Sequence, residues 1–78
     1  MNFNKLRSYI KEDEFEIRVF QNKVNVLNYE SIGHFDSNKI IIRHHEGSLI
    51  INGECLVVSK LLNDEILVTG VIKAIELR

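Results

Sequence analysis

The chain has 78 residues, with 10 basic and 11 acidic side chains and a formal net charge of -1. A chain of this length forms one domain, and its charge balance argues against a general nucleic-acid binder, which carries an excess of Lys and Arg. The single cysteine, Cys55, excludes an intrachain disulfide and favours a reducing, intracellular setting.

Residues 1–12 are predicted to form a short amphipathic helix. Phe3, Leu6 and Ile10 recur at helical spacing, and charged residues fall on the other side. A frayed terminus is the alternative. Charges interrupt this segment, and no apolar run in the chain approaches the roughly 20 residues of a membrane-spanning helix. We therefore expect a cytoplasmic protein, held at a membrane only through a partner.

From Phe15 onward the hydrophobic period changes to two, which is typical of half-buried strands. Turn-forming residues at 21–23, 34–39, 46–48 and 61–65 divide the remaining chain into short strands. We expect residues 13–78 to form a single all-β domain. The predicted architecture is a compact antiparallel sandwich, roll or small barrel of about six to seven short strands.

Gly53 interrupts the most strand-like part of the chain, LIINGECLV. Similar apolar spacing surrounds Gly70 and Asn28, and Asn tolerates positive φ better than most residues. We interpret the three positions as bends or bulges at which one strand contributes to two walls of the same core. A simple turn between separate strands is the alternative. If Gly53 needs positive φ or a close backbone approach, Gly53→Val should destabilise the domain by about 1 kcal/mol or more.

Two segments, KIIIR (39–43) and CLVV (55–58), are apolar at consecutive positions. Both faces of such strands need cover, and a chain this short supplies little. We therefore expect a homo-oligomer, with the N-terminal helix as the alternative cover. An exposed edge along KIIIRHH is predicted as a possible interaction edge, with Lys39, Ile41, Arg43 and His45 as its contact residues.

No residue pattern specifies catalysis. His44 and His45 are neighbours on a predicted strand, so they point to opposite faces, and no second cysteine or zinc motif is present. We interpret Cys55 as a small core residue rather than a nucleophile, and the acidic run 12–16 as a solvated strand edge. The sequence predicts no enzyme, no metal, no cofactor and no small-molecule substrate.

Residues 14–77 resemble the small sporulation proteins of the YabP and YqfC type. The resemblance is carried by VNVLNYESI, SIGHFDSNKIII, GSLIINGECLVV and ILVTGVIKAIEL, in this order and spacing. The YqfC branch tends to carry prolines near its start, and this chain has none, which favours the YabP branch. The resemblance implies a non-enzymatic role in building the endospore, in the mother cell, next to a membrane-embedded sporulation protein at the forespore membrane.

Two functions are compatible with these observations. The first is a structural or assembly protein of endospore formation that self-associates and contacts a membrane protein, with no nucleic acid involved. The alternative is a small regulatory module that recognises RNA or a peptide through an exposed strand edge.

Overall fold

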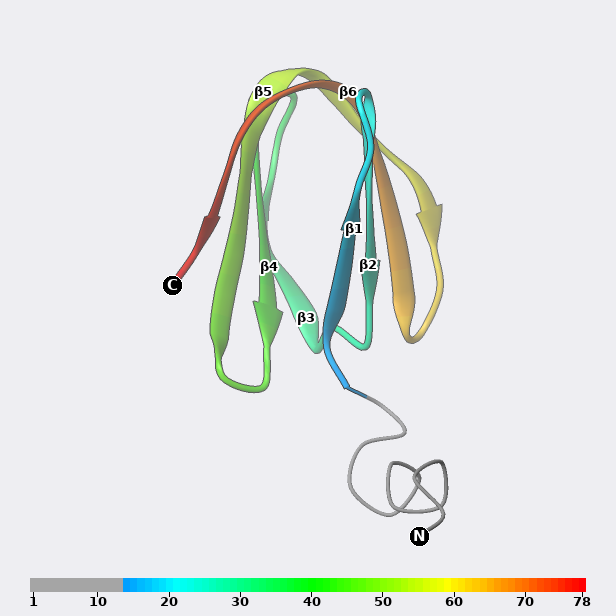
Figure 1. Cartoon of the computed structure of the whole chain (residues 1–78), viewed down its shortest axis with the longest axis vertical. Coiled ribbons are helices and arrows are strands. Elements are labelled where there is room, and N and C mark those ends of the chain that lie inside the picture. The colour runs from blue at the N-terminus through cyan, green and yellow to red at the C-terminus, as the bar shows by residue number, and fades with distance from the viewer. Residues whose placement is uncertain (1–13) are drawn as a thin grey trace, which may run out of the picture.

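The computed structural model describes residues 14–78, which form one six-stranded antiparallel sheet (Figure 1). The strand order is β1-β2-β6-β5-β4-β3. The all-β prediction is confirmed, whereas the helix predicted over residues 1–12 lies outside the described residues. The strands are β1 (Glu16–Val19), β2 (Lys23–Leu27), β3 (Ser31–Phe35), β4 (Lys39–His44), β5 (Gly47–Leu61) and β6 (Glu65–Leu77).

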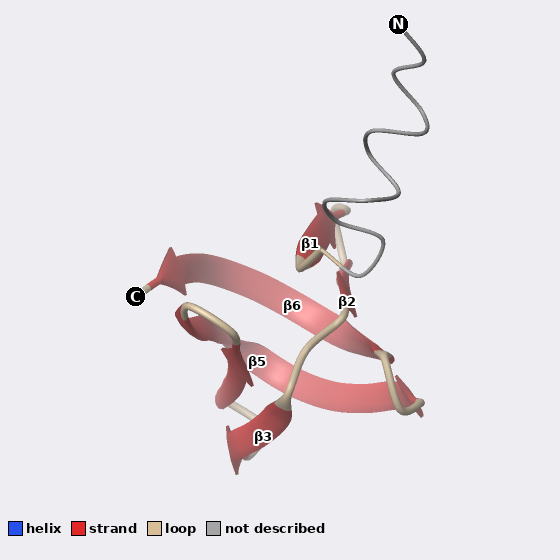
Figure 2. Ribbon diagram, turned by 90° about the horizontal axis from the view of Figure 1, so that it is seen from below, coloured by secondary structure: helices blue, strands red, loops and turns tan. Residues whose placement is uncertain are grey.

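The sheet folds over on itself because its two longest strands, β5 and β6, bend in the middle (Figure 1). The bend divides the sheet into two layers. The first, the β1 layer, contains β1, β2, residues 65–69 of β6 and residues 57–61 of β5. The second, the β3 layer, contains β3, β4, residues 47–54 of β5 and residues 71–77 of β6. Figure 2 looks into the open end of the resulting sandwich, opposite the bend.

The core lies between the two layers and follows from the alternating pattern of the strands. In β2 and β4, every second residue is fully buried, while the residues between them face outward. Both layers contribute to one cluster of nine buried side chains: Val24, Val26, Ile40, Ile42, Leu49, Ile51, Leu56, Ile66 and Val68.

Gly53 and Gly70 lie at the bend. The β5–β6 register shifts between Asn52 and Gly53 and again between Glu54 and Val57, so the two strands are bulged on both sides of the bend. A Cβ atom on Gly53 would overlap the backbone carbonyl oxygen of Val71. Gly70 has a φ of 132°, which disfavours any side chain.

Asn28 behaves differently from the two glycines. It has a φ of 61°, in the left-handed region, but it joins the separate strands β2 and β3. Asn28 therefore lies in a simple turn between two separate strands, which was the alternative interpretation of the three positions. The bend therefore uses glycine for close approach and for positive φ, whereas Asn28 supplies only the positive φ of a turn.

The two hairpin turns hold the bend in place. The carbonyl oxygen of Asn38, in the β3–β4 turn, accepts the N–H of Gly53 at 3.0 Å. The carbonyl oxygen of Asn22, in the β1–β2 turn, accepts the N–H of Gly70 at 3.1 Å. Because a bulge removes ladder partners, these bonds satisfy backbone groups that would otherwise be left unpaired at the bend.

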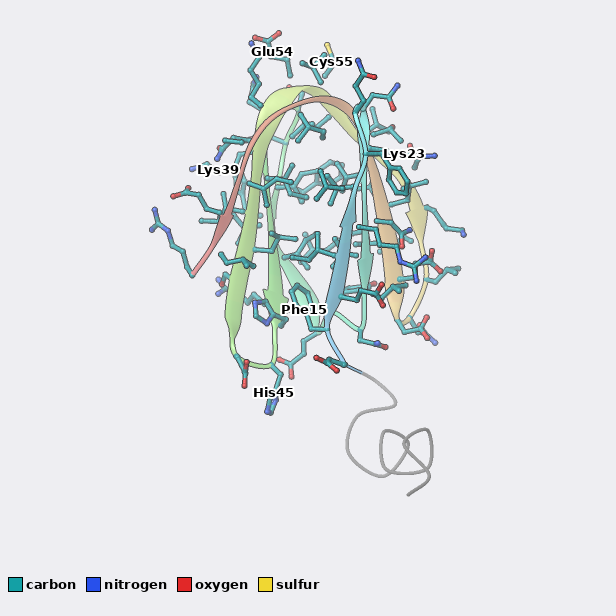
Figure 3. The ribbon with its side chains drawn as sticks, viewed as in Figure 1. Phe15, Lys23, Lys39, His45, Glu54 and Cys55 are labelled. Carbon is teal, nitrogen blue, oxygen red and sulfur yellow. The ribbon has the colours of Figure 1, made fainter. Side chains whose placement is uncertain are left out.

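Cys55 is exposed, so the prediction that it is a core residue is wrong. The physical reason is the bulge between Glu54 and Val57, where Cys55 adopts a φ of 55°. The extra residue shifts the alternation, and the neighbouring Leu56 is buried in the core instead. Figure 3 shows the Cys55 side chain pointing away from the sandwich at the bend, next to Glu54.

Cys55→Gly is expected to stabilise the domain by about 1 kcal/mol, because glycine adopts a left-handed φ without the steric cost that a Cβ atom adds. For a domain of this size the melting temperature should rise by about 4–8 °C. Cys55→Ala is the matched control, because it removes the thiol and keeps the Cβ atom. Thermal unfolding followed by circular dichroism measures both. An equal gain for the two variants would show that the thiol, and not the backbone, is responsible.

Candidate interaction surfaces

Four strand segments at the margins of the sandwich pair with a neighbouring strand on one side only and have no neighbour on the other side among the described residues. In the β1 layer they are β1 and residues 57–61 of β5, and in the β3 layer they are β3 and residues 71–77 of β6. Each presents a row of backbone N–H and C=O groups to its surroundings. Such edges are templates for pairing with another chain.

On each free edge, one apolar side chain that faces the core is exposed. In every case the residue directly opposite on the neighbouring strand is fully buried, so both point toward the core. The core is therefore not closed at its margins. The four pairs, with the exposure of the edge residue, are Val19 opposite Val24 (57%), Phe35 opposite Ile40 (55%), Leu61 opposite Ile66 (58%) and Leu77 opposite Leu49 (65%).

The four edges differ in how strongly they resist pairing. Charged residues protect β1, which carries Glu16 and Arg18, and residues 71–77 of β6, which carry Lys73 and Glu76. Residues 57–61 of β5 carry one charge, Lys60, and β3 has no Lys, Arg, Asp or Glu. β3 has only a register shift between Ile32 and His34. Its edge and that of β5 are the least protected.

A cavity of about 580 Å³ lies at the open end of the sandwich, where the connections between strands meet. The Phe15 ring stacks on the imidazole of His44 across this end, with ring centroids 3.9 Å apart and an interplanar angle of 10°. Figure 3 shows Phe15 and His45 at this end, far from the bend. The lining residues come from both layers: Glu14, Phe15, Asn28, Tyr29, Glu30, His44, His45, Glu46 and Asp64.

Hydrogen bonds fix the walls of this cavity. The Asn28 side-chain amide donates to the carbonyl oxygen of Glu14 at 2.7 Å, and the Tyr29 hydroxyl donates to that of Leu62 at 2.6 Å. The Nδ1 atom of His44 accepts the Glu46 N–H at 3.4 Å. The Nε2 atom of the same ring is buried and has no hydrogen-bond partner among the described residues. The wall is preformed and leaves one imidazole nitrogen unsatisfied.

The predicted interaction edge of Lys39, Ile41, Arg43 and His45 is not a sheet edge. β4 pairs with β3 on one side and with β5 on the other, so its backbone groups are already used. Lys39 and Arg43 are exposed, Ile41 is half-buried, and His45 lies in the β4–β5 turn and lines the cavity. Whether these side chains contact a partner stays a prediction. The edge was misplaced because the sequence does not reveal strand order.

Outside the cavity, Asp36 is a titratable group held by structural partners. Hydrogen bonds from the His34 ring and from the backbone N–H groups of Asn38 and Lys39 lower the pKa of Asp36 to about 2. These contacts close the β3–β4 turn. Within residues 14–78, no three His, Cys, Asp or Glu side chains gather as metal ligands would. The same residues contain no helix long and apolar enough to span a membrane.

The model of the YabP family matches residues 14–78, which is the whole of the described sheet and both bends. No curated protein and no solved structure matches the chain.

Proposed function

This chain belongs to the YabP family, and on that premise we propose that it is a non-enzymatic assembly protein of bacterial endospore formation. The observation that carries the proposal is the family match, because it covers every strand from β1 to β6. Family membership suggests a role in sporulation. The structure adds surfaces suited to protein contacts.

Self-association is the first part of the proposed mechanism. The edges of β3 and of residues 57–61 in β5 offer unpaired backbone groups and few charges. Strand addition by a second copy would satisfy these groups and cover Phe35 and Leu61, whose side chains extend the core to the surface. A small domain with an incomplete core gains stability in this way.

Contact with a membrane-embedded sporulation protein is the second part. In this proposal the chain works in the cytoplasm of the mother cell and lies at the forespore membrane through that partner. Self-association would then gather several membrane partners at one place.

Deletion of the gene in its native host tests the proposal. We expect vegetative growth to be unchanged and the ratio of heat-resistant spores to total cells to fall, with recovery when the gene is restored. A normal spore count in the deletion strain, also when related genes are removed, would contradict a role in spore assembly.

The free edges also favour a second candidate, a regulatory module that binds an extended peptide by strand addition. It predicts a monomer that adds one peptide, whereas the assembly proposal predicts a mass that rises with protein concentration.

A further inference from the structure

The acidic side chains of residues 14–78 fall into two groups. Those outside the cavity each have a side-chain partner: Glu16, Glu54, Glu65 and Glu76 form ion pairs with Lys or Arg, and Asp36 accepts a hydrogen bond from the His34 ring. The others form no ion pair with any described residue: Glu14, Glu30, Glu46 and Asp64. All four of these line the cavity at the open end. Unpaired carboxylates are therefore concentrated at one place on the described surface.

The charge of the cavity wall is of one sign. None of the described Lys or Arg side chains lines it. Like charges on one concave wall repel one another and raise the local concentration of cations. The wall is complementary to a positively charged group, and nothing in residues 14–78 supplies one.

The aromatic side chains and the imidazole of the wall restrict the kind of cation. Phe15 and His44 form a stacked pair, and Tyr29 lines the same cavity. Aromatic faces bind ammonium and guanidinium groups. Nδ1 of His44 accepts the Glu46 N–H, and the Nε2 atom of the same ring has no hydrogen-bond partner among the described residues. A peptide supplies both a cationic side chain and carbonyl oxygens.

We propose that this cavity binds a Lys- or Arg-rich peptide segment of the partner protein, with the cationic side chain among Glu14, Glu30, Glu46 and Asp64. The inference rests on the proposed function, in which the partner is a membrane protein. Cytoplasmic segments next to membrane-spanning helices carry an excess of Lys and Arg. A cavity of about 580 Å³ has the size of an ordinary ligand site and accommodates such a side chain.

The test measures binding of a fluorescein-labelled peptide of alternating Arg and Ser to the full chain, by fluorescence anisotropy at low salt. The matched peptide of alternating Glu and Ser should not bind. Glu30→Gln combined with Glu46→Gln should weaken binding of the Arg peptide about tenfold, since the double variant removes two ion pairs with the peptide. Glu54→Gln combined with Glu76→Gln removes the same charge outside the cavity and should weaken it less than about twofold.

Two results would overturn the inference. Equal weakening by both double variants would mean that the peptide responds to net charge and not to the cavity. Tighter binding after Lys5→Gln, Arg7→Gln and Lys11→Gln in the full chain would mean that the N-terminal segment of this chain is the occupant. Neither result bears on the spore count of the deletion strain, so the assembly role and the peptide site fail independently.

Discussion

Gly53→Ala is expected to destabilise the domain by at least about 2 kcal/mol, although it adds only one methyl group. The methyl carbon would overlap the carbonyl oxygen of Val71, which lies across the bulge on β6. Backbone cannot rotate away as a side chain does. To relieve the overlap, β5 and β6 would have to separate at the bend, where Gly53 pairs with Ile72 and Glu54 pairs with Val71.

Gly33→Ala is the matched control. A Cβ atom at Gly33 would lie 2.9 Å from Nε of Arg43, but this contact is with an exposed, flexible side chain that can move. The expected change in the free energy of unfolding is within about 0.5 kcal/mol. Urea unfolding of the two variants and the parent, at equal concentration, measures the difference. Equal destabilisation by the two substitutions would contradict the close-approach explanation of Gly53.

The bend shows how much of this fold could be predicted. Glycines inside long apolar runs indicated a corner in one strand, and the structure has this corner at Gly53 and Gly70. Bulges also limit the assignment of residues to the two faces of a strand by alternation. Period-two alternation assigns Cys55 and Leu56 to faces only if the register is unbroken, and one extra residue reverses the assignment.

The free edges and the cavity could not be predicted from the sequence, for a different reason. Strand order decides which strands are marginal, and KIIIRHH could not be distinguished from a marginal strand by its composition. The four carboxylates of the cavity come from separate points of the chain, at residues 14, 30, 46 and 64. The sequence did contain a pattern, since the segment before β1 and three strand connections each carry an acidic residue. Only the fold shows that these points meet at one end of the sandwich.

The edges and the bend are linked. Because β5 and β6 cross from one layer to the other, each strand has a neighbour on both sides in one layer and on only one side in the other. A sheet folded in this way gains a second layer from few residues and acquires four margins. The bend in β5 and β6 lets a small chain enclose a core, and it also leaves the margins of that core open to a second copy.

Leu61→Lys is expected to convert self-associated protein to monomer without unfolding it. Leu61 lies on one of the two least charged margins, opposite the buried Ile66, and its side chain is half exposed. A lysine there can keep its stem on the core and its ammonium group in water, so the monomer tolerates it. A second strand added at this edge would bury the ammonium group, which is costly without a partner.

Leu62→Lys is the matched control, because it places the same charge one residue further, in the β5–β6 turn, where no strand can be added. Leu77→Lys examines the opposite margin, on β6. Light scattering coupled to size exclusion, over a range of protein concentrations, should show a rising mass for the parent chain and for Leu62→Lys, and a monomer for Leu61→Lys. Loss of association in Leu77→Lys alone would move the interface to β6. A parent chain that remains monomeric at every concentration would rule out self-association through any edge, and the assembly role would then depend entirely on the membrane partner.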